Sequence, residues 1–319
     1  MDLRLATFNL ENLGLRPDED TEAVRAWLPV HLTALRAMLR RLDADAVAFQ
    51  ELLDPSLLPA LVEGLGYPHI AVADDGGPSP LRIGVLSRYP LRDPAAVATR
   101  ADLRAADRKS GLTIRVQGAF SRPVLEVRWC LPGLEIYLVV LHWKSKIPSP
   151  IGSESGEARW ESLAQVGEGR LVSEIKRLAQ AVEVRRVVDR HLTENPDACL
   201  AVLGDFNDTL DSEGVRIVRG DARSAGAPRL TSQELVPCEL AIPRDLRFTH
   251  IFRGHREMLD HIFLSRGLMP RFVSARVLNE DLNEAAEGPL PAAEADRGWA
   301  PDPFVCGSDH APFVVTLKL

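Results

Sequence analysis

The chain has 319 residues, of which 45% are hydrophobic and 26% are charged. This length and composition predict a globular protein that can bury a substantial core. The formal net charge of −7 counts against a general nucleic-acid-binding protein. However, residues 280–302 alone carry seven carboxylates and one arginine, a local charge of −6 that leaves −1 for the rest of the chain. The overall charge therefore does not exclude a polyanionic substrate.

The sequence gives no sign of a membrane or of secretion. No stretch approaches the ~18 uncharged apolar residues of a spanning helix, and residues 1–9 lack the basic start and apolar run of a signal peptide. We therefore expect a cytoplasmic protein with no membrane partner. The four cysteines have no Cys-x-x-Cys spacing, which argues against a zinc knuckle or a disulfide framework. We interpret them as buried free thiols: Cys130, Cys199, Cys238 and Cys306.

Short apolar, β-branched runs alternate along the chain with helical periods. The runs predict strands at residues 3–8, 46–49, 83–86, 125–129, 136–141, 200–203, 259–264 and 313–317. Two series of apolar residues at helical spacing predict helices, the second of which must end before Pro196: Leu32, Leu35, Leu39 and Leu42, then Leu171, Ile175, Leu178 and Val182. Because several strands directly follow strands, an α/β fold with mixed sheets is favoured over a doubly wound one.

Two segments lack any apolar periodicity. Residues 145–158 mix Pro, Gly and Ser, and residues 280–303 are acidic with four prolines, so both are expected to be loops. Neither has the length or composition of a linker between independently folding units. We therefore expect residues 1–319 to form a single domain.

Carboxylates, amides and imidazoles stand where apolar runs stop. They do so in residues 6–9, 47–51, 140–142, 202–207, 258–261 and 307–310. In α/β folds, sites assemble at the carboxyl ends of strands, because the strands fix the origin of side chains that the loops present. A single Asp or Asn in such a place is more often a turn former or a helix cap. The prediction of a site therefore rests on the whole set.

The set contains the groups that hydrolysis of a phosphodiester requires. Glu51, Asp205 and Asp309 offer oxygen ligands to a hard cation such as Mg²⁺ or Mn²⁺, and Asn9 and Asn207 add neutral amides. Two imidazoles, those of His142 and His310, titrate near neutrality, and Asp260 can orient one of them. Attack of water on a phosphodiester needs a metal, a base for the water and an acid or metal for the leaving oxygen.

Seven stretches carry a resemblance to a known family. They are Thr7-Phe8-Asn9-Leu10-Glu11-Asn12, Phe49-Gln50-Glu51, Gly84-Val85-Leu86-Ser87-Arg88-Tyr89-Pro90-Leu91, His142-Trp143-Lys144-Ser145-Lys146, Leu203-Gly204-Asp205-Phe206-Asn207-Asp208, Leu259-Asp260-His261-Ile262-Phe263-Leu264-Ser265 and Ser308-Asp309-His310-Ala311-Pro312. In sequence and order they resemble the endonuclease/exonuclease/phosphatase superfamily, which includes pancreatic-type deoxyribonuclease, AP endonucleases, inositol polyphosphate phosphatases and bacterial sphingomyelinases. The resemblance spans nearly the whole chain.

The resemblance implies a four-layer sandwich of two mixed β-sheets with helices on the outer faces. It also implies roles for the site residues. Glu51 is the main metal ligand, with Asn9 and Asp309 beside it. Asp205 orients or deprotonates the attacking water, and Asn207 holds a phosphate oxygen. His310, paired with Asp260, faces the phosphoryl group, and His142 protonates the leaving group.

Cationic residues near these stretches are candidates for phosphate contacts. Arg122, Lys144 and Lys146 fit that role, since guanidinium and ammonium groups favour anionic oxygens, although each alone is more often a solvated surface charge. A second metal at His250, His255 and His261 is disfavoured, because His261 faces away from Asp260 in a strand.

Three functions remain open at this point. We favour a nuclease or other phosphodiesterase, with nucleic acid as substrate and Mg²⁺ or Mn²⁺ as cofactor. The alternative is a phosphatase or phosphodiesterase of a phosphorylated small molecule or inositol phosphate. Against it, residues 202–207 and 307–310 do not reproduce the signatures of the inositol phosphatases. A sphingomyelinase is disfavoured by the lack of an export signal. A catalytically inactive scaffold would need a replaced ligand, and none is replaced.

Overall fold

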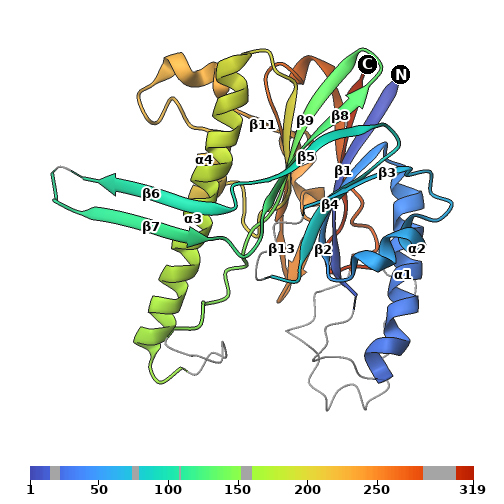
Figure 1. The fold of residues 1–319 in the computed structure, drawn as a ribbon, viewed down its shortest axis with the longest axis horizontal. Coiled ribbons are helices and arrows are strands. Elements are labelled where there is room, and N and C mark those ends of the chain that lie inside the picture. Colours follow the sequence, from blue (N-terminus) through green and yellow to red (C-terminus); the bar gives the residue numbers. More distant parts are fainter. Residues whose placement is uncertain (15–21, 74–78, 108, 152–159, 283–306) are drawn as a thin grey trace.

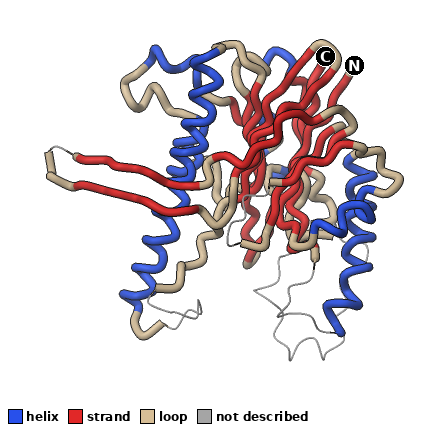
Figure 2. The backbone as a smooth tube through the Cα atoms, viewed as in Figure 1, coloured by secondary structure: helices blue, strands red, loops and turns tan. Residues whose placement is uncertain are grey.

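Two six-stranded β-sheets packed face to face form the centre of the protein (Figure 1). The computed structural model describes residues 1–14, 22–73, 79–107, 109–151, 160–282 and 307–319. Each sheet is covered on its outer side by helices, so that the order of layers is helix, sheet, sheet, helix (Figure 2). The four-layer sandwich of mixed sheets expected from the resemblance is confirmed.

The first sheet has the strand order β15-β16-β1-β2-β4-β3. Its strands are β1 (Asp2–Leu13), β2 (Ala46–Leu52), β3 (His69–Val72), β4 (Arg82–Ser87), β15 (Phe272–Val277) and β16 (Phe313–Lys318). Only β1 and β2 run parallel, while every other neighbouring pair is antiparallel.

The second sheet has the strand order β11-β14-β10-β9-β8-β5. Its strands are β5 (Leu91–Val97), β8 (Val124–Leu131), β9 (Leu134–His142), β10 (Leu200–Asp205), β11 (Val236–Pro237) and β14 (Asp260–Leu264). Here β9 and β10 are the only parallel pair. Each sheet thus has one central parallel pair, whose carboxyl ends lie side by side.

Four α-helices cover the outer faces. Helices α1 (Glu22–Leu42) and α2 (Leu58–Val62) pack on the first sheet, and α3 (Leu163–Glu194) and α4 (Glu213–Arg219) pack on the second (Figure 1). Short 3-10 helices occupy Pro55–Leu57, Pro228–Gln233, Cys238–Ala241, Arg244–Leu246 and Met269–Arg271. Among the described residues, no helix is both long and apolar enough to cross a membrane.

Apolar residues between the sheets and beneath the helices explain why the predicted strands form. Both faces of the central strands are buried, so these strands read as continuous apolar runs instead of alternating ones. All eight strands predicted from these runs are present, most of them extended by one to five residues. The predicted helices are present too, and α3 ends at Glu194, before Pro196.

Two antiparallel ribbons lie outside the sheets and were not predicted. The longer one consists of β6 (Arg100–Ala106) and β7 (Thr113–Ala119) and projects past α3 as an arm (Figure 1). The shorter one consists of β12 (His250–Phe252) and β13 (His255–Glu257). The residues of these ribbons are largely exposed, so they leave no apolar run in the sequence.

The structure corrects the expected burial of α3 and of the cysteines. Leu171 is 60% exposed, and the buried stripe of α3 includes Ser173 and Arg177 instead, because the first half of this helix covers the polar 145–151 segment and not a sheet. Of the cysteines, Cys238 is buried but Cys130 and Cys199 are partly exposed, while Cys306 is outside the described residues.

The two segments expected to be loops are described only in part. Residues 145–151 contain no helix or strand, as predicted, whereas residues 152–158 and 283–303 are outside the described residues. Two carboxylates of the acidic segment 280–302 are described, and both pair with Arg41, from Glu280 at 2.9 Å and from Asp281 at 2.5 Å.

Candidate active site

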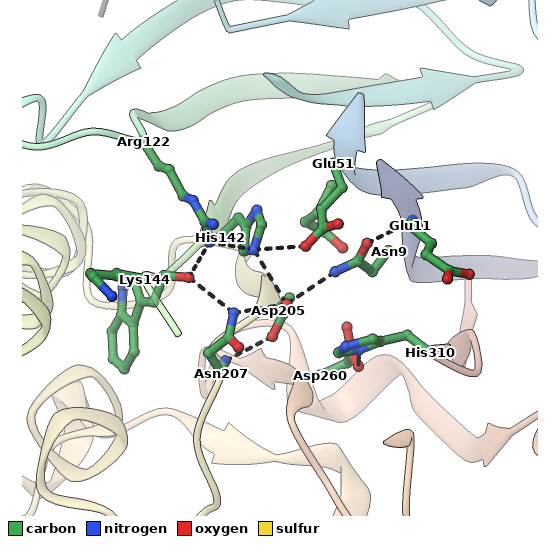
Figure 3. A network of polar contacts seen from close by, with 12 residues as sticks. Asn9, Glu11, Glu51, Arg122, His142, Lys144, Asp205, Asn207, Asp260 and His310 are labelled. Atoms are coloured by element: carbon green, nitrogen blue, oxygen red, sulfur yellow. Dashed lines mark hydrogen bonds and ion pairs between the residues drawn. The ribbon is translucent and has the colours of Figure 1, made fainter. Parts of the chain in front are cut away.

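Polar side chains from both sheets meet at one end of the sandwich (Figure 3). Asn9 and Glu51 lie toward the carboxyl ends of β1 and β2, and His142 and Asp205 end β9 and β10. Asp260 begins β14, which is antiparallel to β10, so it lies directly opposite Asp205. Likewise His310 precedes β16, which is antiparallel to β1. The two parallel pairs and their antiparallel neighbours therefore bring six distant parts of the sequence together.

Asp205 is at the centre of this network. The amide Nδ2 atoms of Asn9 and Asn207 donate to Asp205 Oδ2 at 3.1 and 3.0 Å, and the backbone N–H of Asn207 donates to Oδ1 at 2.7 Å. Burial raises the pKa of Asp205 to about 7, a balance in which the charge of His310 lowers the pKa and the charges of Asp260 and Glu51 raise it. A carboxylate with such a pKa can accept a proton from water near neutral pH.

Gly204 permits the close approach of β10 to β9 beside this carboxylate. Its φ is +141°, and a Cβ atom there would lie 2.0 Å from the backbone oxygen of Leu141. Any side chain at this position would push the two strands apart. Glycine therefore keeps Asp205 in register with His142.

His310 and Asp260 form a buried pair. His310 Nδ1 lies 2.7 Å from Asp260 Oδ2, and Asp260 Oδ1 has no hydrogen-bond partner within the described structure. Burial alone would lower the pKa of His310, but the charges of Asp260 and Asp205 and the hydrogen bond to Asp260 raise it well above its usual range. The imidazole therefore carries a positive charge at neutral pH.

His142 has different surroundings. Its Nε2 lies 2.5 Å from Arg122 Nη1 and 3.4 Å from carboxylate oxygens of both Glu51 and Asp205. Because a guanidinium can only donate, Nε2 is the acceptor in the contact with Arg122. Burial, followed by the charges of Arg122 and His310, holds the pKa of His142 well below its usual value. The imidazole is therefore neutral as placed.

The carboxylates on the first sheet are held by an irregular backbone. Glu11, Asn12 and Glu51 all have positive φ, of 47°, 54° and 61°, a region that costs non-glycine residues energy. The backbone N–H of Asn12 donates to Glu51 Oε2 at 3.1 Å, and that of Asp309 donates to Glu11 Oε2 at 3.0 Å. This conformation fixes Glu51 and joins Glu11 to the Asp309 loop.

Glu11 is a partly buried carboxylate that the predicted set of site residues did not include. Loss of hydration, together with the charges of Asp309 and Glu51, raises its pKa to about 8. With Glu51 and Asp205 nearby, the site gathers several carboxylates whose mutual repulsion is costly without a cation.

Three overlapping groups of side chains could hold a metal ion, each with ligand atoms within 4.8 Å of one another. They are Glu51, His142 and Asp205; Asp205, Asp260 and His310; and His250, Asp309 and His310. The expected ligands Glu51 and Asp309 fall into different groups, with Glu11 near both. This donor set, rich in oxygen and in uncompensated negative charge, fits a hard divalent cation.

The remaining predicted residues line the second sheet's side of the site. Asn207 Nδ2 donates to the backbone oxygen of Trp143 at 3.0 Å as well as to Asp205. Lys144 donates from Nζ to the backbone oxygen of Ile147 at 2.6 Å. Burial, then the charge of Arg122, lowers the pKa of Lys144 to about 8. Lys146 pairs with Asp208 at 2.7 Å. Both lysines are therefore engaged by protein groups.

Arg177 and Asp208 hold these loops in place. The buried Arg177 pairs with Asp208 and donates to the backbone oxygens of Lys144 at 2.9 Å and Asn207 at 3.1 Å. It acts as a positioning residue that ties the loop after β9 to the loop after β10.

Of the three histidines near Asp260 in sequence, only His250 lies at the site. The ring of His250 is 4.9 Å from that of His310. As predicted, His261 faces away from Asp260: its Nδ1 lies 2.7 Å from Glu239 and its Nε2 lies 2.8 Å from the backbone oxygen of Asp208. His250, His255 and His261 do not form a metal-binding group among the described residues.

Comparison with known sequences identifies the family. The profile of the endonuclease/exonuclease/phosphatase family matches residues 6–310, which is nearly the whole chain. The chain belongs to this family. It is accordingly a phosphoric ester hydrolase, and the family is typically dependent on a divalent metal. Among curated proteins, none matches the chain.

Solved structures share the fold of this family member. TDP2 from Caenorhabditis elegans is 15% identical, with a TM-score of 0.58 over 100% of this chain and 75% of that one. The human Nocturnin catalytic domain with bound sulfate is 15% identical, with a TM-score of 0.58 over 99% and 94%. A Bacteroides thetaiotaomicron endonuclease/exonuclease/phosphatase family protein is 17% identical, with a TM-score of 0.54 over 99% and 97%. At these identities the likeness is one of fold.

Two kinds of site residue were missed in the sequence. Glu11 lies inside the first matching stretch, where the similarity to the family was visible but no role was assigned. Arg177 lies on a helix, away from any strand end, and the only signal was a charged residue on the buried face of that helix. A search for polar residues at the ends of apolar runs finds the residues at the centre of the site and overlooks those that position them.

Proposed function

We propose that this family member is a metal-dependent phosphodiesterase whose substrate is a nucleic-acid strand. The arrangement around Asp205 carries the proposal. A buried carboxylate with a pKa of about 7 faces a protonated imidazole, which a second carboxylate holds. A proton acceptor for water and a positive group for the phosphoryl oxygens thus lie on opposite sides of one small space.

The metal would be held by the first sheet's side of the site. We assign Glu51, Asn9 and Asp309 as ligands and add Glu11 as a neighbouring carboxylate. Carboxylate and amide oxygens favour Mg²⁺ or Mn²⁺. When bound, the metal neutralises charge on the phosphoryl oxygens and lowers the pKa of a water molecule.

The chain's own residues orient and move protons around the substrate. Asp205 accepts a proton from the attacking water, while Asn9 and Asn207 fix the direction of its carboxylate through hydrogen bonds of 3.1 and 3.0 Å. The His310 imidazolium, held by Asp260, faces the phosphoryl oxygens and stabilises the charge that develops on them. Asn207 reaches a phosphate oxygen only by giving up one of its present contacts.

We assign protonation of the leaving oxygen to His142. As placed, its imidazole is neutral and accepts from Arg122, so it must gain a proton before it can act as an acid. A bound substrate phosphate would allow this, because Arg122 could then donate to a phosphate oxygen instead of to His142. His142 would lose a positively charged neighbour, and its pKa would rise. Lys144 and Lys146 are assigned to further phosphate contacts, for which each has to leave its present partner.

The proposed histidine acid favours a substrate whose leaving group is an unactivated sugar hydroxyl, as in a nucleic-acid strand. A sugar alkoxide is a poor leaving group that benefits from a proton, whereas a nitrophenolate leaves without one. His142→Ala should therefore slow hydrolysis of a strand more than hydrolysis of bis-p-nitrophenyl phosphate. Equal losses on the two substrates would remove the acid role from His142.

A product assay tests the proposed function. Plasmid DNA, single-stranded DNA, RNA, bis-p-nitrophenyl phosphate and a phosphomonoester would be incubated with the protein and Mg²⁺, Mn²⁺ or Ca²⁺ in parallel. We expect cleavage of at least one nucleic acid in Mg²⁺ or Mn²⁺. If all nucleic acids stay intact while a phosphorylated small molecule or inositol phosphate is turned over, the phosphatase alternative takes the place of the proposed function.

Metal binding tests the assignment of Glu51. The Glu51→Gln variant keeps the shape of the side chain but removes the charge that a hard cation needs. We expect Mn²⁺ affinity to fall by at least about a hundredfold in isothermal titration calorimetry, since even the loss of an outer partner typically costs 10- to 100-fold. Unchanged Mn²⁺ affinity would place the metal elsewhere.

A further inference from the structure

The arm formed by β6, β7 and the turn between them carries a charge opposite to that of the whole chain. Residues 100–119 contain five cationic residues and two carboxylates, a net charge of +3 in a chain of −7. Both carboxylates are engaged locally: Asp102 accepts from Gln117 at 3.2 Å, and Asp107 accepts from the Ser110 hydroxyl at 2.6 Å within the turn. These carboxylates offset two of the five positive charges, and a net charge of +3 remains on the arm.

Three of its arginines share one face. Side chains alternate along a strand, so Arg100 and Arg104 of β6 project to the same side, and Arg115 of β7 lies directly opposite Arg104. All three are exposed, and among the described residues no carboxylate pairs with any of them. Like charges directly opposite each other destabilise a two-stranded ribbon. Asp102 lies on the same face between Arg100 and Arg104 and offsets part of this repulsion, so the opposed Arg104 and Arg115 form a surface that a bound anion would stabilise further.

The other face fixes the base of the arm to the body. Ala101 and Phe120 are buried against Ala179 of α3, with Leu103 and Val116 packed around them. Beyond this cluster, Gln180 of α3 donates to the backbone oxygen of Arg122 at 2.7 Å. The arm is thus joined to the helix that also holds the site loops.

The arm leads directly into the active site. Arg122 follows the end of β7 by three residues, and its guanidinium lies beside His142 (Figure 3). Seven residues separate Arg115 from Arg122, which is at most roughly 23 Å at ~3.3 Å per strand residue. A nucleic-acid strand in duplex geometry covers that distance with about seven nucleotides, at ~3.4 Å each.

We propose that this arm is a binding surface for the nucleic-acid strand on one side of the scissile phosphate, with Arg104 and Arg115 clamping its backbone. The inference rests on the proposed function and extends it from the reacting phosphate to the flanking nucleotides. The arm has no aromatic residue, and its contacts are arginine side chains, so it binds phosphates and does not read the bases. The arm therefore favours long strands over short ones, whatever their sequence.

The test compares an arm variant with a control of equal charge. Arg104→Ala/Arg115→Ala removes the opposed pair, and Arg40→Ala/Arg229→Ala removes two exposed arginines elsewhere, one of them on α1 at the other side of the sandwich. Binding of a fluorescent 20-nucleotide strand would be measured by anisotropy at several salt concentrations. Cleavage of this strand, of a 4-nucleotide strand and of bis-p-nitrophenyl phosphate would be followed in parallel.

For the arm variant we expect roughly tenfold weaker binding of the long strand and a salt slope about 1.4 lower, at ~0.7 for each lost phosphate contact. Cleavage of the two short substrates should stay within about twofold of wild type. Arg104→Lys/Arg115→Lys and the control pair should keep most of the binding.

Wild-type affinity and salt slope in the arm variant would overturn the proposal, as would arm-dependent binding to phosphatidylserine vesicles without binding to the strand. If the wild type binds the strand through the arm but cleaves no nucleic acid, the proposed function fails and the arm surface stands.

Discussion

Two histidine–carboxylate pairs lie on either side of strand β14, at adjacent residues. Asp260 faces the site and pairs with His310, and His261 faces the opposite side of the sheet and pairs with Glu239, both at 2.7 Å. In the outer pair both ring nitrogens have an acceptor, since His261 Nε2 also meets the Asp208 backbone oxygen. In the site pair, Asp260 Oδ1 has no partner in the described structure, and the surrounding carboxylates repel one another.

The difference separates a pair built for stability from one built for chemistry. Both pairs join a histidine Nδ1 to a carboxylate oxygen at 2.7 Å, so neither the chemical groups nor the distance distinguishes the two pairs. Among the residues that the structure describes, each pair leaves one buried carboxylate oxygen without a partner, Asp260 Oδ1 in the site pair and Glu239 Oε2 in the outer pair. What differs is the charge around each pair: both ring nitrogens of His261 meet protein oxygens, whereas further carboxylates surround the site pair. Sites commonly give up stability in this way, because gathered like charges are available to a ligand or a metal.

The largest expected effect is on the site side, at Asp205. Asp205→Asn should lower turnover by ~10² to 10⁴, since the amide cannot accept a proton from water. In the metal-free protein it should also raise the melting temperature at pH 8. The folded-state pKa of about 7 lies above the usual aspartate value of 3.8, so ionisation of Asp205 costs the wild type stability as pH rises between these values. The gain in melting temperature should vanish near pH 4, where Asp205 of the wild type is protonated. Turnover within tenfold of wild type would contradict the role of Asp205.

The site pair should behave as one unit in catalysis. His310→Ala and Asp260→Asn should each lower turnover by about two to three powers of ten, and the double variant should lose little more than the worse single one. The reason is that Asp260 acts only through His310, which it orients and keeps protonated. Steady-state kinetics of the three variants would measure this, and fully additive losses would mean that the two residues act separately.

The outer pair should affect stability without affecting catalysis. His261→Gln should lower the free energy of unfolding by about 3–5 kcal/mol, because it leaves a buried carboxylate without its charged partner. His261→Leu/Glu239→Leu should be less destabilising than the single change, since it leaves no buried charge. Urea unfolding followed by circular dichroism gives the free energies, and kcat per folded molecule should stay within about threefold. A variant that is stable but inactive would place His261 in the reaction.

The smallest expected effect is the pH dependence of that stability difference. Burial alone would lower the pKa of His261, but the charge of Glu239 and the hydrogen bonds raise it above the usual histidine value of 6.5. The stabilisation is therefore complete below pH 6.5 and is lost as the pH rises through the folded-state pKa. The wild type should exceed His261→Gln most at pH 6 and less in alkaline solution. A difference that grows with pH would show that His261 is buried in its neutral form.

The sequence predicted the strands and the centre of the site for a common reason. Central strands buried on both faces read as apolar runs, and the residues that end them are visible as sudden polar breaks, as at Asp205 and His142. Exposed ribbons such as β6 and β7 have no long apolar run and therefore no visible polar break at its end. Positioning residues such as Arg177 depend on which loop packs against which helix face, and that information is in tertiary contacts and not in the local pattern.

The central position of β1 sets an order of events during synthesis. This strand comprises the first residues of the chain, yet one of its two neighbours is β16, the last strand, with Asp2 opposite Lys318. Domains are completed as the chain emerges from its N-terminus, so β1 keeps an unpaired edge until β16 has been synthesised. His310 arrives only with that last strand. A chain that lacks β16 and the residues just before it therefore contains no complete active site.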